Sequence, residues 1–266
     1  MIFIKKILEF FLKIFLIFGI KISINRAKSN VDFEYLEKNT WLPYLNKNNY
    51  YFNLYFETID KSNSRDSDSF SKQIRFYSLM NIVKNICKNK KIENFVECGC
   101  WKGHSTLLIS SILKENSFNK EFLVFDSFEG GLSSKVEQDI NFDRYQSNTK
   151  KDIIKKNYFK SNYEDVKNLV KDYKFVKIFK GWIPAQFDYA NNMKFSFVHI
   201  DVDLFNPTRD SLDFFYDKLI DGGIIVCDDY NYSDYPGAKK AVDYFLKDKD
   251  IKLFYEVPLG SCIIIK

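Results

Sequence analysis

The sequence lacks an apolar run long enough to cross a membrane. Within the N-terminal stretch MIFIKKILEFFLKIFLIFGIKISI, the longest uncharged run extends only from Ile14 to Ile20, whereas a membrane-spanning helix needs roughly 20 apolar residues. Charges interrupt the apolar region and no small-residue cleavage site follows it, which disfavours a secretory signal peptide.

The charges of this stretch have a helical arrangement. Lys5, Lys6, Glu9 and Lys13 fall within an arc of about 100° on one helix face. We therefore expect residues 1–24 to form an amphipathic helix. It either packs on protein, in the domain or a second subunit of a homo-oligomer, or lies in a membrane surface; an uncleaved targeting segment is the third alternative.

A dense basic cluster with interleaved aromatic residues is also missing. The formal net charge is +5, with 45% hydrophobic and 28% charged residues, as in an ordinary globular protein. This excludes a disordered chain and gives no indication of nucleic-acid binding.

Cysteine is scarce, and its number is odd. The five cysteines favour free thiols in a reducing cytoplasm over a disulfide framework. The pair Cys98 and Cys100 has no second cysteine pair and few histidines to complete a zinc site.

The chain changes character along its length. Residues 25–69 are rich in Asn, Ser and Tyr with weak periodicity, so we expect an irregular extension ahead of one domain at residues 70–266. A helix is predicted over Phe70 to Asn89. Its recurring apolar residues are Ile74, Leu79, Ile82, Val83 and Ile86.

From Asn94 onward, short apolar runs alternate with helical segments. The predicted strands are Phe95–Cys98, Glu121–Asp126, Phe175–Lys180, Phe195–Asp201, Gly223–Asp228, Ile251–Tyr255 and Cys262–Ile265. The predicted helices are Ser105–Lys114, Tyr163–Tyr173, a short piece after Pro184, Thr208–Leu219 and Ala238–Leu246. This alternation predicts an α/β fold with a mostly parallel seven-stranded sheet, helices on both faces and a C-terminal antiparallel hairpin.

Ligands of open α/β sheets bind beyond the carboxyl ends of the strands. The first strand is followed by VECGCWKGHST, a glycine-containing turn into a helix whose free N–H groups can bind an anionic or carboxylate-bearing ligand. It is not G-x-G-x-x-G, so a nicotinamide fingerprint is absent. Glu97 on the strand suits a positively charged ligand better than a pyrophosphate.

The next two strand ends carry an acidic and an aromatic residue. Asp126 follows one βαβ step and is placed to bind the hydroxyls of a ribose, although Asp is also a common strand terminator. Gly181 allows close backbone approach, and Trp182 offers a flat surface for an adenine or fills the core.

The fourth and fifth strands end in HIDVD and IIVCDDY. Adjacent parallel strands bring Asp201, Asp228 and Asp229 to one edge of the sheet. Three clustered carboxylates repel unless they bind a cation, and carboxylates with waters suit Mg²⁺. A divalent ion there can bind a substrate hydroxyl and lower its pKa.

These motifs resemble the macrocin O-methyltransferase family in order and spacing, over roughly Phe70 to Leu246. The motifs are FVECGCWKGHST, VFDSFEGG, KGWIPAQF, HIDVDLFNPT and GGIIVCDDYNYSDYPGAKKAVDYF. The resemblance implies a Rossmann-like class I fold, S-adenosylmethionine (SAM) as methyl donor, and Mg²⁺-dependent methylation of a sugar hydroxyl in a bacterial pathway.

The resemblance also assigns roles to residues. Those implied to bind SAM are Glu97, Cys98, Gly99, Cys100, Trp101, Gly103, Ser105, Asp126, Ser127, Phe128, Gly181 and Trp182. Asp201, Asp228 and Asp229 are the implied metal ligands. Asp203 and His199 are candidates for the general base, although His199 is as compatible with a hydrogen-bonded residue inside a strand.

Two questions stay open. Asp201 and Asp203 also form the DxD of a metal-dependent glycosyltransferase, which would not need the glycine turn or the paired Asp228 and Asp229. The acceptor is expected to be a small molecule or a glycan precursor. The protein is expected in the cytoplasm, or peripherally on the inner face of the cytoplasmic membrane if residues 1–24 act as an anchor.

Overall fold

The computed structural model describes residues 49–89, 91–129, 132–140, 159, 161–232 and 235–266. The amphipathic helix predicted for residues 1–24 lies outside the described residues. Among those described, no helix combines the length and apolar character that a membrane span requires. Each of the five cysteines is described and carries a free thiol.

A seven-stranded sheet is the centre of the described fold, in the order β3-β2-β1-β4-β5-β7-β6. The first five strands are parallel, and β7 runs antiparallel to both β5 and β6. The strands are β1 (Asn94–Cys98), β2 (Phe122–Asp126), β3 (Val176–Lys180), β4 (Phe195–Ile200), β5 (Leu219–Cys227), β6 (Leu253–Glu256) and β7 (Cys262–Ile265). The predicted parallel sheet with a C-terminal antiparallel hairpin is confirmed.

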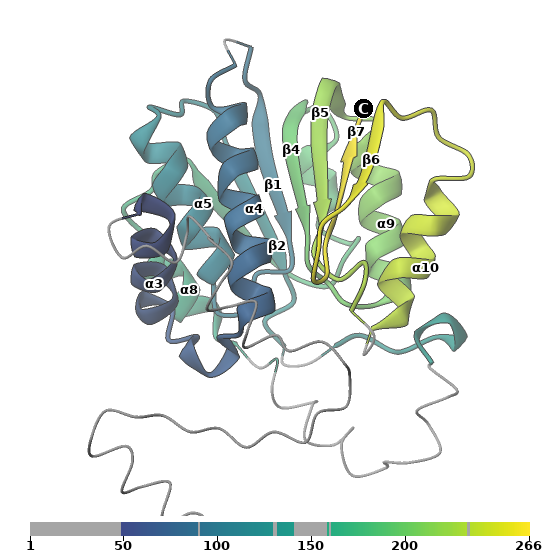
Figure 1. Cartoon of the computed structure of the whole chain (residues 1–266), viewed down its shortest axis with the longest axis horizontal. Coiled ribbons are helices and arrows are strands. Elements are labelled where there is room, and N and C mark those ends of the chain that lie inside the picture. Colours follow the sequence, from purple (N-terminus) through teal and green to yellow (C-terminus); the bar gives the residue numbers. More distant parts are fainter. Residues whose placement is uncertain (1–48, 90, 130–131, 141–158, 160, 233–234) are drawn as a thin grey trace, which may run out of the picture. The chain divides into compact units, whose positions relative to one another are not determined.

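The helices form two layers on the sheet (Figure 1). One layer holds α3 (Tyr50–Lys61), α4 (Phe70–Ile86), α5 (His104–Glu115) and α8 (Tyr163–Leu169). The other holds η4 (Phe187–Ala190), α9 (Phe205–Tyr216) and α10 (Pro236–Phe245). Every residue of β4 is buried, as expected for a central parallel strand covered on both faces.

Side-chain alternation along the strands sends neighbouring residues to opposite layers. Phe95 and Phe197 belong to the core shared with α3, α4, α5 and α8. Val96 and Val198 belong to the core shared with α9 and α10. The same alternation decides which polar residues of β1 and β4 face which layer.

The expectation of an irregular segment over residues 25–69 is wrong for Tyr50–Lys61. The helix α3 lies there, capped by the Asn49 side chain, which accepts a hydrogen bond from the Tyr51 N–H at 2.8 Å. Leu54, Tyr55 and Ile59 are buried in the core with α4 and α5. The aromatic-rich face is stable because it packs on the domain, which a weak intrinsic periodicity does not reveal.

The buried stripe of α4 differs from the predicted one. Its buried residues are Phe76, Leu79, Met80 and Val83, whereas Ile74, Ile82 and Ile86 are only half-buried. The stripe is therefore rotated around the helix, and at its N-terminal end it continues into Lys72 and Arg75, at helical spacing.

The start of α9 is fixed by a residue distant in sequence. Asp139, in the short 3-10 helix η3 (Glu137–Asp139), is buried. Its Oδ1 accepts a hydrogen bond from the Phe205 N–H at 2.7 Å, and its Oδ2 accepts one from the Val136 N–H at 2.9 Å. Since Leu204 provides no side-chain cap, Asp139 satisfies a free N–H of this helix end. The helix consequently begins at Phe205, ahead of the predicted Thr208.

Candidate active site

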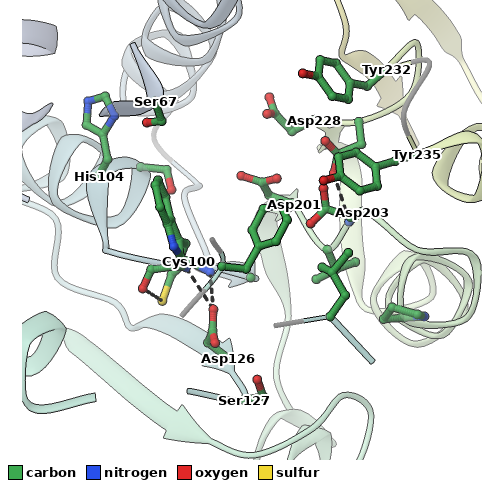
Figure 2. A pocket seen from close by; sticks show the side chains of 18 of the residues that line it. Ser67, Cys100, His104, Asp126, Ser127, Asp201, Asp203, Asp228, Tyr232 and Tyr235 are labelled. Carbon is green, nitrogen blue, oxygen red and sulfur yellow. Dashed lines mark hydrogen bonds between the residues drawn. The ribbon is translucent and has the colours of Figure 1, made fainter. Parts of the chain in front are cut away.

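A cavity of about 480 Å³ lies at the carboxyl ends of β1, β2, β4 and β5, the edge at which α/β folds bind ligands. Figure 2 shows Asp126 and Ser127 at one end of it and Tyr232 and Tyr235 at the other, with Asp201 between them. Helix α4 contributes the wall that holds Lys72, Arg75 and Phe76.

The turn between β1 and α5 is anchored by the next strand. The N–H groups of Cys100 and Trp101 both donate to Oδ2 of Asp126, at 2.8 and 3.0 Å. Successive N–H groups that converge on one anion form a nest, and here its anion is the protein's own carboxylate. Oδ1 of Asp126 accepts a further hydrogen bond from the Phe128 N–H at 2.9 Å. The N–H groups of Cys100 and Trp101 therefore already have a hydrogen-bond acceptor within the protein.

Gly99 allows this turn to pass close to β4. Its φ is +83°, a region that strongly favours glycine. A Cβ at this position would overlap the carbonyl oxygen of Asp201 and stand 2.8 Å from its carbonyl carbon. The turn and the end of β4 are in contact because residue 99 has no side chain.

Three carboxylates meet at the ends of β4 and β5. One oxygen each from Asp201, Asp228 and Asp229 lies within 4.8 Å of the others. Asp228 and Asp229 are each only 6% exposed. Asp203 is also buried and lines the cavity, and its N–H donates to Oδ2 of Asp229 at 3.1 Å. The structure thus brings together the four aspartates predicted for the metal and the chemistry.

Burial and mutual repulsion make Asp201 and Asp229 hard to ionise. Burial, and secondarily the charge of Asp228, raise the pKa of Asp201 to about 6. Burial also raises the pKa of Asp229 well above its usual range, with contributions from Asp203, Asp201 and Asp228. Groups in this condition are stabilised in their charged form by a nearby cation.

One such cation comes from α4. Arg75 forms an ion pair with Asp228 through Nη1 and Oδ2, and the same Nη1 donates to the Asp228 carbonyl at 3.3 Å. Burial lowers the pKa of Arg75, but the charges of Asp228, Asp229 and Asp201 outweigh that effect and leave its pKa raised. Arg75 was not predicted from the sequence, because the apolar residues of the helix alone do not show that an arginine extends its buried face.

A second cation of α4 has a different environment. The ammonium of Lys72 donates to Oγ of Ser67 at 2.6 Å and lies 5.9 Å from the ring centroid of Trp101. Burial lowers the pKa of Lys72 to about 8, although Asp201 and Asp228 act in the opposite direction. The ion pairs found within the described part of the chain do not include Lys72.

Glu97 and His199 form a buried pair beneath the acidic cluster. Both side chains are fully buried, and Nδ1 of His199 lies 3.0 Å from Oε1 of Glu97. Thr106 donates its hydroxyl to the other oxygen of Glu97. Burial lowers the pKa of His199, but its hydrogen bond with Glu97 outweighs that effect and leaves the pKa raised.

Neither member of this pair lines the cavity. Strand alternation places both with Phe95 and Phe197, toward the layer of α4 and α5. In this structure the side chain of Glu97 therefore contacts His199 and not the cavity, and His199 lies as a hydrogen-bonded residue inside a strand. Asp203 is left as the candidate base.

Eleven predicted site residues line the cavity. They are Gly99, Cys100, Trp101, Ser105, Asp126, Ser127, Trp182, Asp201, Asp203, Asp228 and Asp229. Trp182 is 38% exposed, and its Nε1 donates to Oε2 of Glu129 at 2.7 Å. Its indole is thus held by a hydrogen bond at the cavity wall and is not core filler.

Four further predicted residues support the site from behind. Cys98 is buried in the core shared with α9 and α10. Gly103 is the N-cap residue of α5, and a Cβ added to it would lie 3.1 Å from the Val166 side chain. Phe128 packs on Tyr163, and Gly181 faces the Gln186 side chain. Their contribution to the cavity is positional.

Aromatic residues missed by the sequence analysis form the far end of the cavity. The rings of Tyr232 and Tyr235 are stacked, with centroids 5.6 Å apart and planes at 17°. Phe159 packs edge-on against Tyr235 and lines the cavity as well. Tyr232 and Tyr235 follow the paired aspartates in NYSDYPG, and this proximity in sequence was the available signal.

Comparison with known proteins identifies the family. The sequence model described as Macrocin-O-methyltransferase (TylF) matches residues 39–256. The chain belongs to this family. Membership makes it a SAM-dependent O-methyltransferase, and the observed sheet has the class I methyltransferase fold. The glycosyltransferase alternative for Asp201 and Asp203 gains no support.

Two relatives of the chain are O-methyltransferases of Streptomyces. The demethyldecarbamoylnovobiocin O-methyltransferase of Streptomyces niveus is 26% identical over 183 residues, which cover 66% of this chain and 67% of the relative. A tetracenomycin-C rhamnosyl 4'-O-methyltransferase of Streptomyces olivaceus is 24% identical over 162 residues, 59% of this chain and 60% of that protein, less than two thirds of its length. The solved O-methyltransferase NovP has a TM-score of 0.57 at 22% identity, covering 71% of this chain and 79% of its own, which shows the shared fold.

Proposed function

We propose that this macrocin-family methyltransferase uses Mg²⁺ to methylate a hydroxyl of a sugar or glycan precursor in a bacterial cytoplasm. The observation that carries the proposal is the set of three carboxylates within 4.8 Å of one another, facing the cavity. Carboxylate oxygens are the ligands that Mg²⁺ prefers.

The residues present fit a divalent cation. Asp228 pairs with the guanidinium of Arg75, whereas burial raises the pKa values of the neighbouring Asp201 and Asp229. Asp201, Asp228 and Asp229 would hold the ion. A bound Mg²⁺ supplies charge that orients a hydroxyl and lowers its pKa.

The residues of the chain divide the remaining work. The β1–α5 turn, Asp126 and Trp182 form the SAM end, and bound SAM supplies a methyl group on a positively charged sulfur. Asp203, which lines the cavity, would take the proton that the acceptor hydroxyl loses. Catalysis then comes chiefly from positioning the hydroxyl beside the methyl group.

Two observations support a sugar acceptor. The Streptomyces relatives are O-methyltransferases named for demethyldecarbamoylnovobiocin and for the 4' position of a rhamnosyl-tetracenomycin. In this chain, the stacked Tyr232 and Tyr235 stand next to the acidic cluster, at the end of the cavity opposite Asp126. Flat rings beside carboxylates suit the apolar face and the hydroxyls of a sugar ring.

Calorimetric titration of the full chain tests this proposal. We expect S-adenosylhomocysteine (SAH) to bind with micromolar affinity, and Mg²⁺ to be required for methyl transfer in a screen of nucleotide sugars and glycan precursors. Methyl transfer at an unchanged rate in excess chelator would contradict the role of the metal. A sugar nucleotide that binds when SAH does not would contradict the whole assignment.

Metal binding should depend on pH in a defined direction. The pKa of Asp201 is raised to about 6, so protonation of Asp201 contributes stability that is complete near pH 4 and is lost as the pH rises through about 6. Mg²⁺ binds only the ionised form. We expect the Mg²⁺-induced increase in Tm to be largest near pH 8 and to vanish toward pH 5. Asp201→Asn is the control, in which Mg²⁺ should raise the Tm only slightly at every pH. An equal Mg²⁺-induced increase in the Tm of the wild type at pH 5 and pH 8 would refute this prediction.

A further inference from the structure

The cation at Lys72 has no anionic partner among the described residues. Lys72 lines the cavity, and its ammonium donates to the neutral hydroxyl of Ser67 at 2.6 Å. Arg75, the other cation of the cavity wall, is engaged by Asp228. A half-buried ammonium without a carboxylate is costly unless an anionic ligand completes its environment.

Nearby carboxylates do not fill this role. Asp228 accepts Arg75, and Asp68 accepts the Tyr55 hydroxyl at 2.8 Å. Asp201 attracts Lys72 at a distance but belongs to the metal cluster. No carboxylate of the described residues therefore pairs with Lys72, and an anionic ligand in the cavity can.

The position of Lys72 restricts which anion that is. Lys72 faces Trp101 in the turn between β1 and α5, and the two N–H groups of that turn are occupied by Asp126. The turn therefore cannot offer these N–H groups to the methionine carboxylate of SAM, which needs another positive partner. Lys72 lies in the first turn of the 17-residue helix α4, where the helix dipole adds to its positive potential.

We propose that Lys72 binds the α-carboxylate of the methionine part of SAM, with Ser67 orienting the ammonium. This assignment rests on SAM being the methyl donor.

The test compares ligands that differ only at this group. SAH carries the carboxylate, and S-adenosyl-3-thiopropylamine is SAH without it. We expect Lys72→Gln to weaken SAH binding by about 10- to 100-fold in calorimetry and to leave the affinity for the decarboxylated ligand within about twofold. Lys72→Arg should retain most of the SAH affinity.

Lys102→Gln is the matched control. Lys102 also lies over the Trp101 ring, at 4.5 Å, but pairs with Asp66 at 3.1 Å and does not line the cavity. Its loss should leave both ligands unaffected. The wild type provides a second test, since it should bind the decarboxylated ligand about as weakly as Lys72→Gln binds SAH.

Each other outcome has a clear meaning. Equal weakening of both ligands by Lys72→Gln, or no weakening of either, would overturn the proposal. Lys72→Gln could also leave SAH binding unchanged and weaken the competition of inorganic pyrophosphate with the acceptor. That result would overturn the proposal and indicate that Lys72 binds a phosphate of the acceptor. A wild type that binds neither adenosyl ligand would instead refute the use of SAM.

Discussion

Asp228→Ala is expected to reduce Mg²⁺-dependent methyl transfer by roughly 100- to 1000-fold and to leave SAH binding nearly unchanged. Asp228 is one of three carboxylates that can share a cation, and the charge of a bound metal is worth several kcal/mol in a transition state, where each 1.36 kcal/mol is a factor of ten. Initial rates against Mg²⁺ concentration and SAH calorimetry measure the two effects. Loss of SAH binding with an unaltered Mg²⁺ response would refute the assignment.

The partner of Asp228 must be considered in this experiment. Without Asp228, the buried guanidinium of Arg75 loses its ion pair, which destabilises a protein by ~3–5 kcal/mol. The double variant Asp228→Ala/Arg75→Met should recover stability but not activity, which separates metal loss from unfolding. Asp221→Ala is the surface control on the same strand, because Asp221 is 89% exposed; it should leave activity unchanged.

Gly99→Ala is expected to destabilise the fold by ~4 kcal/mol, a size that single substitutions reach only through a specific mechanism. The Cβ adds the cost of a side chain at φ +83° to an overlap with the Asp201 backbone. The turn or the end of β4 must shift, so SAH and Mg²⁺ binding should weaken together. Denaturant unfolding and calorimetry measure these changes.

Gly222→Ala isolates the steric part of this effect. Gly222 has a similar φ of +75°, but nothing lies within 4 Å of the added Cβ. Its substitution should cost only the conformational term, ~1–2 kcal/mol. Equal losses for the two variants would show that the close approach of Gly99 to β4 is energetically unimportant.

The sequence predicted the sheet well because its signals are local. Continuous apolar runs mark central parallel strands, and all seven were placed; the largest error at a strand start is at β5, which begins at Leu219 rather than Gly223. The acidic cluster was predictable for the same reason, since adjacent parallel strands end at one edge of the sheet. Helix α3 was missed because its order comes from packing on α4 and α5.

The cations of the site could not be placed from local pattern. Arg75 meets Asp228 across 153 positions in the sequence, and a helical Arg or Lys usually reads as solvent-exposed. The available signal was their spacing from Phe76, Leu79 and Val83, the stripe that is actually buried. Glu97 is the opposite case. Its position at the end of a strand predicts contact with a ligand, but in the structure its carboxylate is hydrogen-bonded to the buried His199.

The ion pair between Arg75 and Asp228 has a consequence for hybrid proteins. Hybrids that exchange N-terminal segments between relatives need a junction that keeps this pair together. A junction between α4 and β1 would import a foreign residue at position 75 and change the charge balance of the native acidic cluster. A junction ahead of Asn49 would keep α3 and α4, and therefore Arg75, in the same native sequence as Asp228. Hybrids joined there should retain their response to the metal.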